Sequence, residues 1–137
     1  MKKLFLDTNI VLDLLAKRQP FYKSAAILFS IADKNKVKLF VSSLTFANTN
    51  YVLSKFKSPQ KAREILKRFK LLVSVQVIDD KIIELALNDE KFTDFEDGLQ
   101  YYAALKSRTA VFITRDLRGF KSANIPVMNA EAFLASG

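Results

Sequence analysis

The sequence predicts a three-layer α/β/α sandwich built around a central five-stranded parallel sheet. Short apolar runs with strand patterns alternate along the chain with amphipathic stretches of helical periodicity, which is the order that βαβ units produce. Acidic residues follow two fully apolar runs, at the strand ends where open parallel sheets place their ligands. No linker, repeat or low-complexity tract interrupts this pattern, so residues 1–137 are expected to form a single domain.

The individual elements follow from local patterns. A buried strand at residues 3–7 ends at Asp7 and opens the first helix at once. The other strands are expected at residues 37–41, 73–77, 110–113 and 125–128. The strand at 73–77 alternates apolar and polar residues, and Pro126 cannot donate a ladder hydrogen bond, so both are expected at sheet edges. Further helices are expected to begin at Pro20, Ser42-Ser43, Ser58, Asp79, Thr93 and Glu131.

Composition restricts the chemistry that the chain can perform. It has no histidine, cysteine or tryptophan, which excludes histidine-based triads, thiolate nucleophiles and ordinary zinc sites. A metal would therefore be a hard ion with oxygen ligands, Mg²⁺ or Mn²⁺. The net charge of +8 favours nucleic acid as a partner over solubility alone. Without a membrane-length apolar run or a signal-peptide pattern, we expect a cytoplasmic protein with no membrane partner.

Three aspartates stand out among the fourteen acidic residues. Asp7 ends one buried strand and Asp116 follows another, and parallel strands finish at the same edge of a sheet. Asp97, with Asp94, heads a helical stripe that continues through Tyr101 toward the core. Because clustered or buried carboxylates need a compensating charge, these residues indicate a bound cation. A divalent ion held there can generate hydroxide and polarise a phosphoryl oxygen.

Several charged residues have structural explanations instead. Thr93 and Glu96 form the capping-box pattern, which assigns Glu96 to the start of a helix. Asp13 lies within an apolar helical run and is expected on its outer side. The basic stretch at residues 55–70 is either a solvated helix face or a phosphate-binding surface, and the sequence does not separate the two.

At the acidic residues the sequence resembles the PIN-domain family, especially the small bacterial VapC-type ribonuclease toxins. Residues 5–9 (Phe-Leu-Asp-Thr-Asn) are similar to the opening acidic motif of the family. Residues 94–100 resemble its third block, and residues 114–116 (Thr-Arg-Asp) resemble its last. Each motif alone is weak, but the ordered set extends from Lys3 to about Phe133 and is fairly specific.

The resemblance implies a five-stranded parallel sheet between helices and a metal-dependent endoribonuclease that hydrolyses RNA phosphodiester bonds. Matched residue by residue, Asp7, Asp97 and Asp116 are the catalytic metal ligands, and Asp94 is a supplementary acid. The resemblance also implies frequent homodimers. In many small relatives a co-expressed antitoxin protein binds and inserts near the acidic pocket.

Supporting residues are expected around these acids. By the same resemblance, the hydroxyls of Thr8 and Thr114 would orient a carboxylate or a water. The loop after the apolar strand at 110–113 carries three cationic side chains, Arg115, Arg118 and Lys121. They are either RNA-binding groups that contact phosphates or solvated loop charges.

One position departs from the family pattern and leaves two functions open. Where the family usually has a glutamate on the helix after the second strand, this chain has Asn48, whose amide offers a metal an oxygen but no charge. The protein is either an active endoribonuclease, such as the toxin of a toxin-antitoxin pair, or a catalytically weak PIN-like module that binds RNA or protein. A phosphoacceptor receiver-like domain is less consistent, because no matching aspartate ends the strand at 73–77.

Overall fold

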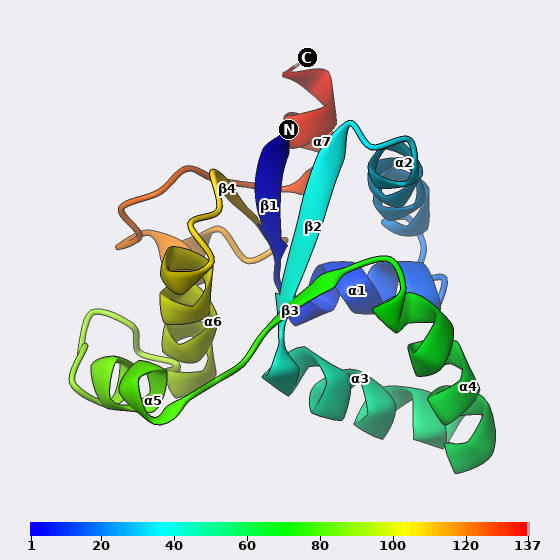
Figure 1. Ribbon diagram of the computed structural model, residues 1–137, viewed down its shortest axis with the longest axis horizontal. Coiled ribbons are helices and arrows are strands. Elements are labelled where there is room, and N and C mark those ends of the chain that lie inside the picture. The colour runs from blue at the N-terminus through cyan, green and yellow to red at the C-terminus, as the bar shows by residue number, and fades with distance from the viewer. Residues whose placement is uncertain (137) are drawn as a thin grey trace.

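Strand β1 (Lys2–Leu6) lies at the centre of a five-stranded, all-parallel sheet in the computed structural model, which describes residues 1–136 (Figure 1). The strand order is β3-β2-β1-β4-β5. The other strands are β2 (Val37–Ser42), β3 (Ser74–Gln76), β4 (Val111–Ile113) and β5 (Val127–Met128). The predicted parallel sheet is confirmed, and β3 and β5 are its edges, as the sequence indicated.

Helices cover both faces of the sheet, so the predicted three-layer sandwich is also confirmed (Figure 1). The helices are α1 (Thr8–Leu15), α2 (Tyr22–Asp33), α3 (Ser43–Phe56), α4 (Pro59–Lys70), α5 (Asp80–Leu87), α6 (Phe95–Lys106) and α7 (Ala130–Ala135), with a 3₁₀ turn, η1, at Arg118–Phe120. Helix α2 begins two residues later than Pro20, where the sequence placed its start.

Alternation along the strands produces two separate apolar cores. Leu4 and Leu6 of β1 pack in one core with side chains from α1, α2, α4 and α7. Phe5 points to the opposite face and stacks on Phe112 of β4, with 5.6 Å between ring centroids, in the core that α5 and α6 cover. Because both faces of β1 are buried, its polar successor Asp7 is fixed at the C-terminal edge of the sheet.

The start of α6 differs from the predicted capping box. The N-cap is Asp94 rather than Thr93, and its Oδ1 accepts a hydrogen bond from the Glu96 backbone N–H at 2.8 Å. The capping-box prediction is therefore wrong, and the Glu96 side chain is not occupied with the helix start. Aspartate satisfies the N-terminal N–H groups of a helix at least as well as threonine.

No helix in the part of the chain that the structure describes is long and apolar enough to cross a membrane. Gly137 lies outside the described residues, and a single domain over 1–137 stays a prediction.

Candidate metal-binding active site

Asp7 occupies the end of the central strand and is also the N-cap of α1. Its side chain is only 8% exposed. One carboxylate oxygen accepts the Thr8 backbone N–H at 2.9 Å, and the other accepts the Thr114 hydroxyl at 2.8 Å and the Asn9 amide at 3.4 Å. Burial raises the pKa of Asp7, and these hydrogen bonds to the charged form only partly oppose the rise.

Asp116 reaches the same edge because β4 pairs directly with β1. Thr114, directly after β4, is buried and donates to Asp7, and its Oγ1 accepts the Asp116 backbone N–H at 3.0 Å. A single hydroxyl thus joins the two acidic segments. The Asp116 carboxylate is exposed, and its Oδ1 accepts the backbone N–H of Gly119 at 3.0 Å.

Asp97, in the first turn of α6, completes the group from a third element. Burial, reinforced by the nearby charges of Asp94, Asp7 and Asp116, raises the pKa of Asp97 to about 7. A Cβ added at Gly119 would lie 2.5 Å from Asp116 Oδ2 and 2.8 Å from Asp97 Oδ2. These two carboxylates therefore border the same small space, which glycine leaves open.

The chemistry of these side chains fits a hard cation. All four sequence-predicted acids carry oxygen donors, and the mutual repulsion that raises the pKa of Asp97 is what a bound cation would relieve. Within residues 1–136, however, no three acidic side chains stand close enough to enclose one ion in this conformation. The carboxylates of Asp7, Asp94, Asp97 and Asp116 converge on the site without closing around a single point.

The hydroxyl of Thr8 hydrogen-bonds to other polar side chains rather than to a carboxylate, and its expected role in orienting a water stays a prediction. Its Oγ1 lies 3.0 Å from Thr45 Oγ1 and accepts a hydrogen bond from Gln100 Nε2 at 3.1 Å. Gln100 Nε2 also donates to Thr45 Oγ1 at 3.2 Å. This buried polar triangle ties α1, α3 and α6 together beside the acids. Sequence reasoning missed Thr45 and Gln100, although a glutamine on the buried stripe of α6 was a usable signal.

Asn48, the departure from the family pattern, lies next to an acid that the sequence analysis had set aside. Its Nδ2 donates to Glu96 Oε1 at 3.3 Å, which links α3 to the start of α6. The charge of Glu96 also contributes to the raised pKa of Asp97. An acidic side chain from α6 therefore stands beside the position where the resemblance implied one from α3.

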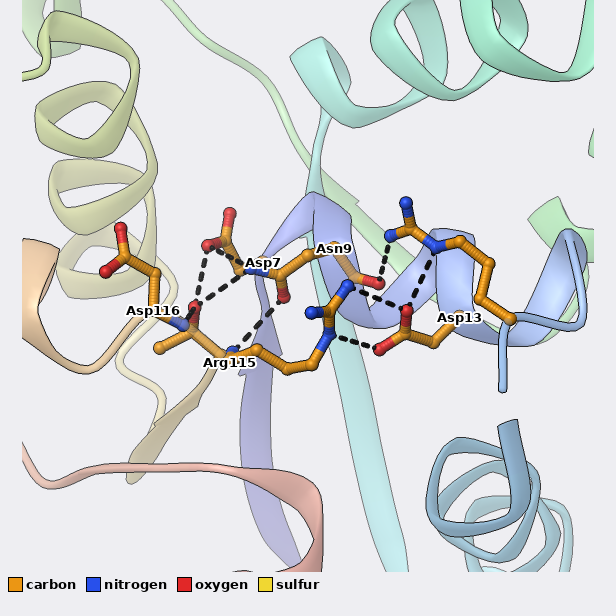
Figure 2. Close-up of polar contacts among 7 residues, drawn as sticks. Asp7, Asn9, Asp13, Arg115 and Asp116 are labelled. Atoms are coloured by element: carbon orange, nitrogen blue, oxygen red, sulfur yellow. Dashed lines mark hydrogen bonds and ion pairs between the residues drawn. The ribbon is translucent and has the colours of Figure 1, made fainter. Parts of the chain in front are cut away.

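Asp13 is buried, so its predicted place on the outer side of α1 is wrong. Its carboxylate pairs with two arginines: Arg18 Nε at 3.1 Å, and Arg115 through Nε at 2.8 Å and Nη2 at 3.1 Å (Figure 2). The predicted RNA-binding role of Arg115 stays a prediction, but its guanidinium is engaged by Asp13. Arg118 and Lys121 are both exposed.

Comparison with known proteins identifies the family. A family model described as "PIN domain" matches residues 3–118. The chain belongs to the PIN-domain family. This PIN-domain protein is 30% identical over 135 residues to "Ribonuclease VapC1" of Aquifex aeolicus, a match that covers 96% of this chain and 93% of that protein.

Solved structures of similar fold include toxin-antitoxin complexes. The PIN-domain chain resembles DNA-bound VapBC from Salmonella typhimurium, with a TM-score of 0.69 and 20% identity over 95% of this chain and 99% of that one. It also resembles a toxin-antitoxin complex from Klebsiella pneumoniae, with a TM-score of 0.68 and 22% identity over 93% and 97% of the two chains. At these identities the likeness concerns the fold.

The raised pKa of Asp97 predicts how stability changes with pH. Between the ordinary value of 3.8 and about 7, the folded protein keeps a proton that the unfolded chain has released. This group therefore makes the metal-free protein less stable as the pH rises through that window, and adds no further loss above it. Asp97→Asn cannot ionise, so its stability relative to wild type should be more favourable near pH 8 than near pH 5.

Urea unfolding in EDTA at the two pH values measures this difference. Asp33→Asn, at an exposed position of α2, is the matched control and should show no pH-dependent difference from wild type. An Asp97→Asn effect of equal size at both pH values would contradict the raised pKa of Asp97.

Proposed function

We propose that this protein is a Mg²⁺- or Mn²⁺-dependent endoribonuclease that hydrolyses RNA phosphodiester bonds. The observation that supports it most is the convergence of Asp7, Asp97 and Asp116 from three separate elements at the C-terminal edge of the sheet. Membership of the PIN-domain family and 30% identity to a protein named as a ribonuclease give this cluster its chemical interpretation.

In this proposal Asp7, Asp97 and Asp116 hold the metal, and Asp94 is the supplementary acid. The bound ion would supply an activated water and polarise the scissile phosphate. The remaining residues keep the acids in place: the Thr114 hydroxyl orients Asp7 and fixes the Asp116 backbone, while the Thr8 backbone N–H holds the second oxygen of Asp7.

The charge distribution supports RNA as the substrate. The basic stretch around α4 carries seven exposed cations, and none of them lies within ion-pair distance of a carboxylate among residues 1–136. They are Lys55, Lys57, Lys61, Arg63, Lys67, Arg68 and Lys70. Five of these cations lie on α4, and Lys55 and Lys57 lie at the C-terminal end of α3. Clustered cations of this kind suit a phosphate backbone. Arg118 and Lys121, near Asp116, would contact phosphates closer to the acids.

The weak-module alternative rests on Asn48, and the contact of Asn48 with Glu96 favours activity instead. Glu96 supplies negative charge at the place where the family glutamate is absent, and Asn48 holds it there. The similarity to VapBC and toxin-antitoxin complexes further supports a toxin role with an antitoxin partner. A homodimer and a cytoplasmic location remain parts of the proposal.

Loss of the central carboxylate should abolish cleavage. Asp7→Asn keeps the size and hydrogen-bonding capacity of the side chain but removes its charge, so Mn²⁺-dependent cleavage of end-labelled single-stranded RNA should fall by at least about 100-fold. EDTA should have the same effect on wild type, and Asp33→Asn should cleave normally. Cleavage that persists in Asp7→Asn excludes the proposed site, and RNA binding without any cleavage in wild type favours the silent module.

Glu96 should strengthen metal binding through its charge. Glu96→Gln keeps a partner for Asn48 but removes the charge, so the Mn²⁺ dissociation constant from calorimetry should rise about fivefold. Glu90→Gln, also exposed but without a part in the raised pKa of Asp97, is the control and should bind Mn²⁺ as wild type does. If Glu96→Gln and Glu90→Gln bound Mn²⁺ with equal affinity, Glu96 would have no part in metal binding.

The basic surface of α4 should contribute to RNA affinity in a salt-dependent way. Replacing Arg63 and Lys67 by alanine removes two cations one helical turn apart, which should lower the slope of log affinity against log salt by about 1.4 for single-stranded RNA. The control is the double alanine variant of Lys34 and Lys36, which are exposed in the loop between α2 and β2, at the N-terminal end of the strands. Fluorescence anisotropy in EDTA measures the RNA affinity of both double variants at several salt concentrations. Equal slopes for the two would show that the α4 cations are only solvated.

A further inference from the structure

Asp13, a buried acid outside the acidic cluster, forms an ion pair with the partly buried Arg115. Asp13 is 1% exposed, and the two parallel hydrogen bonds from Arg115 are reinforced by the third, from Arg18. The Arg115 guanidinium also lies 3.9 Å above the ring of Phe21. A buried ion pair is weak evidence for a stabilising role, since well-packed apolar residues often do as well. The position of this ion pair therefore needs an explanation other than stability.

Arg115 stands between two residues of the acidic site. Thr114 donates to Asp7, and Asp116 faces Asp97. Arg115 lies in a bend just after β4, and its side chain is anchored on the α1 side while the Asp116 carboxylate lies on the α6 side, next to Asp97. Figure 2 shows Arg115 extending to Asp13 while Asp116 points the opposite way.

Asn9 joins the ion pair to the acids from the same helix. Its Oδ1 accepts the Arg115 backbone N–H at 3.3 Å, and its Nδ2 contacts Asp7 Oδ2 at 3.4 Å and Thr114 Oγ1 at 3.3 Å. The backbone and the side chain of Arg115 are therefore both attached to α1. Without these contacts, Asp116 would be held mainly by local bonds to Thr114 and Gly119.

We propose that Asp13 and Arg115 are positioning residues, which anchor the segment after β4 on helix α1 so that the Asp116 carboxylate faces Asp97. Engagement by Asp13 also keeps the guanidinium of Arg115 away from the adjacent acids, where a fixed cation would compete with a metal. The inference rests on the proposed metal-binding function, but the anchoring itself can be measured without metal.

Arg18 provides the matched control, because it pairs with the same carboxylate but forms no hydrogen bond to residues 114–119. Arg115→Met and Arg18→Met each remove one guanidinium from Asp13 while keeping an unbranched apolar stem. Amide hydrogen exchange in EDTA should be faster at residues 114–119 in Arg115→Met and unchanged there in Arg18→Met. The Mn²⁺ dissociation constant from calorimetry, without RNA, should rise at least about tenfold in Arg115→Met alone.

Kinetics separate positioning from substrate contact. Arg115→Met should lower kcat and leave KM for RNA close to that of wild type. A raised KM with normal Mn²⁺ binding would instead make Arg115 an RNA-contact residue and overturn the inference. Equal exchange rates at 114–119 in the two methionine variants would also overturn it, whether or not the protein binds metal.

Arg115→Lys keeps the test decisive if Arg115→Met does not fold. It retains the charge beside Asp13 but cannot form the two parallel bonds, so exchange at 114–119 should still accelerate and Mn²⁺ affinity should still fall. If Arg115→Lys matched wild type in exchange rate and Mn²⁺ affinity, the charge alone would suffice and the two parallel hydrogen bonds would have no role. Failure of wild type to bind Mn²⁺ or cleave RNA would count against the proposed function, while the exchange data still decide the anchoring.

Discussion

The carboxylate of Asp7 is almost completely buried at the end of the central strand. This burial opposes its ionisation, and the nearby charges of Asp116 and Asp94 add to the effect. Helix N-termini offset part of this cost, because Asp7 and Asp94 are N-caps and Asp97 lies in the first turn of α6. The raised pKa of Asp97 shows that the offset is incomplete. Folding therefore concentrates negative charge that a cation would neutralise, and binding of such a cation would stabilise the folded protein.

Neutral donors contact Asp7, whereas Arg115 and Arg18 pair with Asp13. Thr114 and Asn9 contribute uncharged hydrogen bonds to Asp7, so they fix its geometry without cancelling its charge. Arg115 immediately precedes Asp116 in the chain yet pairs with Asp13, as Arg18 does. A buried acid outside the site thus preserves the negative charge of the site. This division explains how a protein of net charge +8 can keep an electronegative centre.

The sequence predicted the parts of the site that local patterns determine. Apolar runs before Asp7 and Thr114 marked buried strands, and the stripe from Asp97 to Tyr101 marked an inward helix face, which the buried Tyr101 confirms. Burial of Asp13 was not predictable in this way, because its partner Arg115 is 102 positions distant. The start of α6 was misassigned because Thr93 and Asp94 are adjacent residues that both suit an N-cap, and the choice depends on where Glu96 finds its partner.

The hydrogen bond between Asn48 and Glu96 brings an uncharged donor to an acid beside the proposed site. A glutamate at position 48 would stand beside Glu96 and add to the repulsion that already raises the pKa of Asp97. An asparagine there donates a hydrogen bond instead, which stabilises the charge of Glu96 at no electrostatic cost. Asn48 and Glu96 therefore form one hydrogen-bonded unit, in which the amide on α3 contacts an acid on α6.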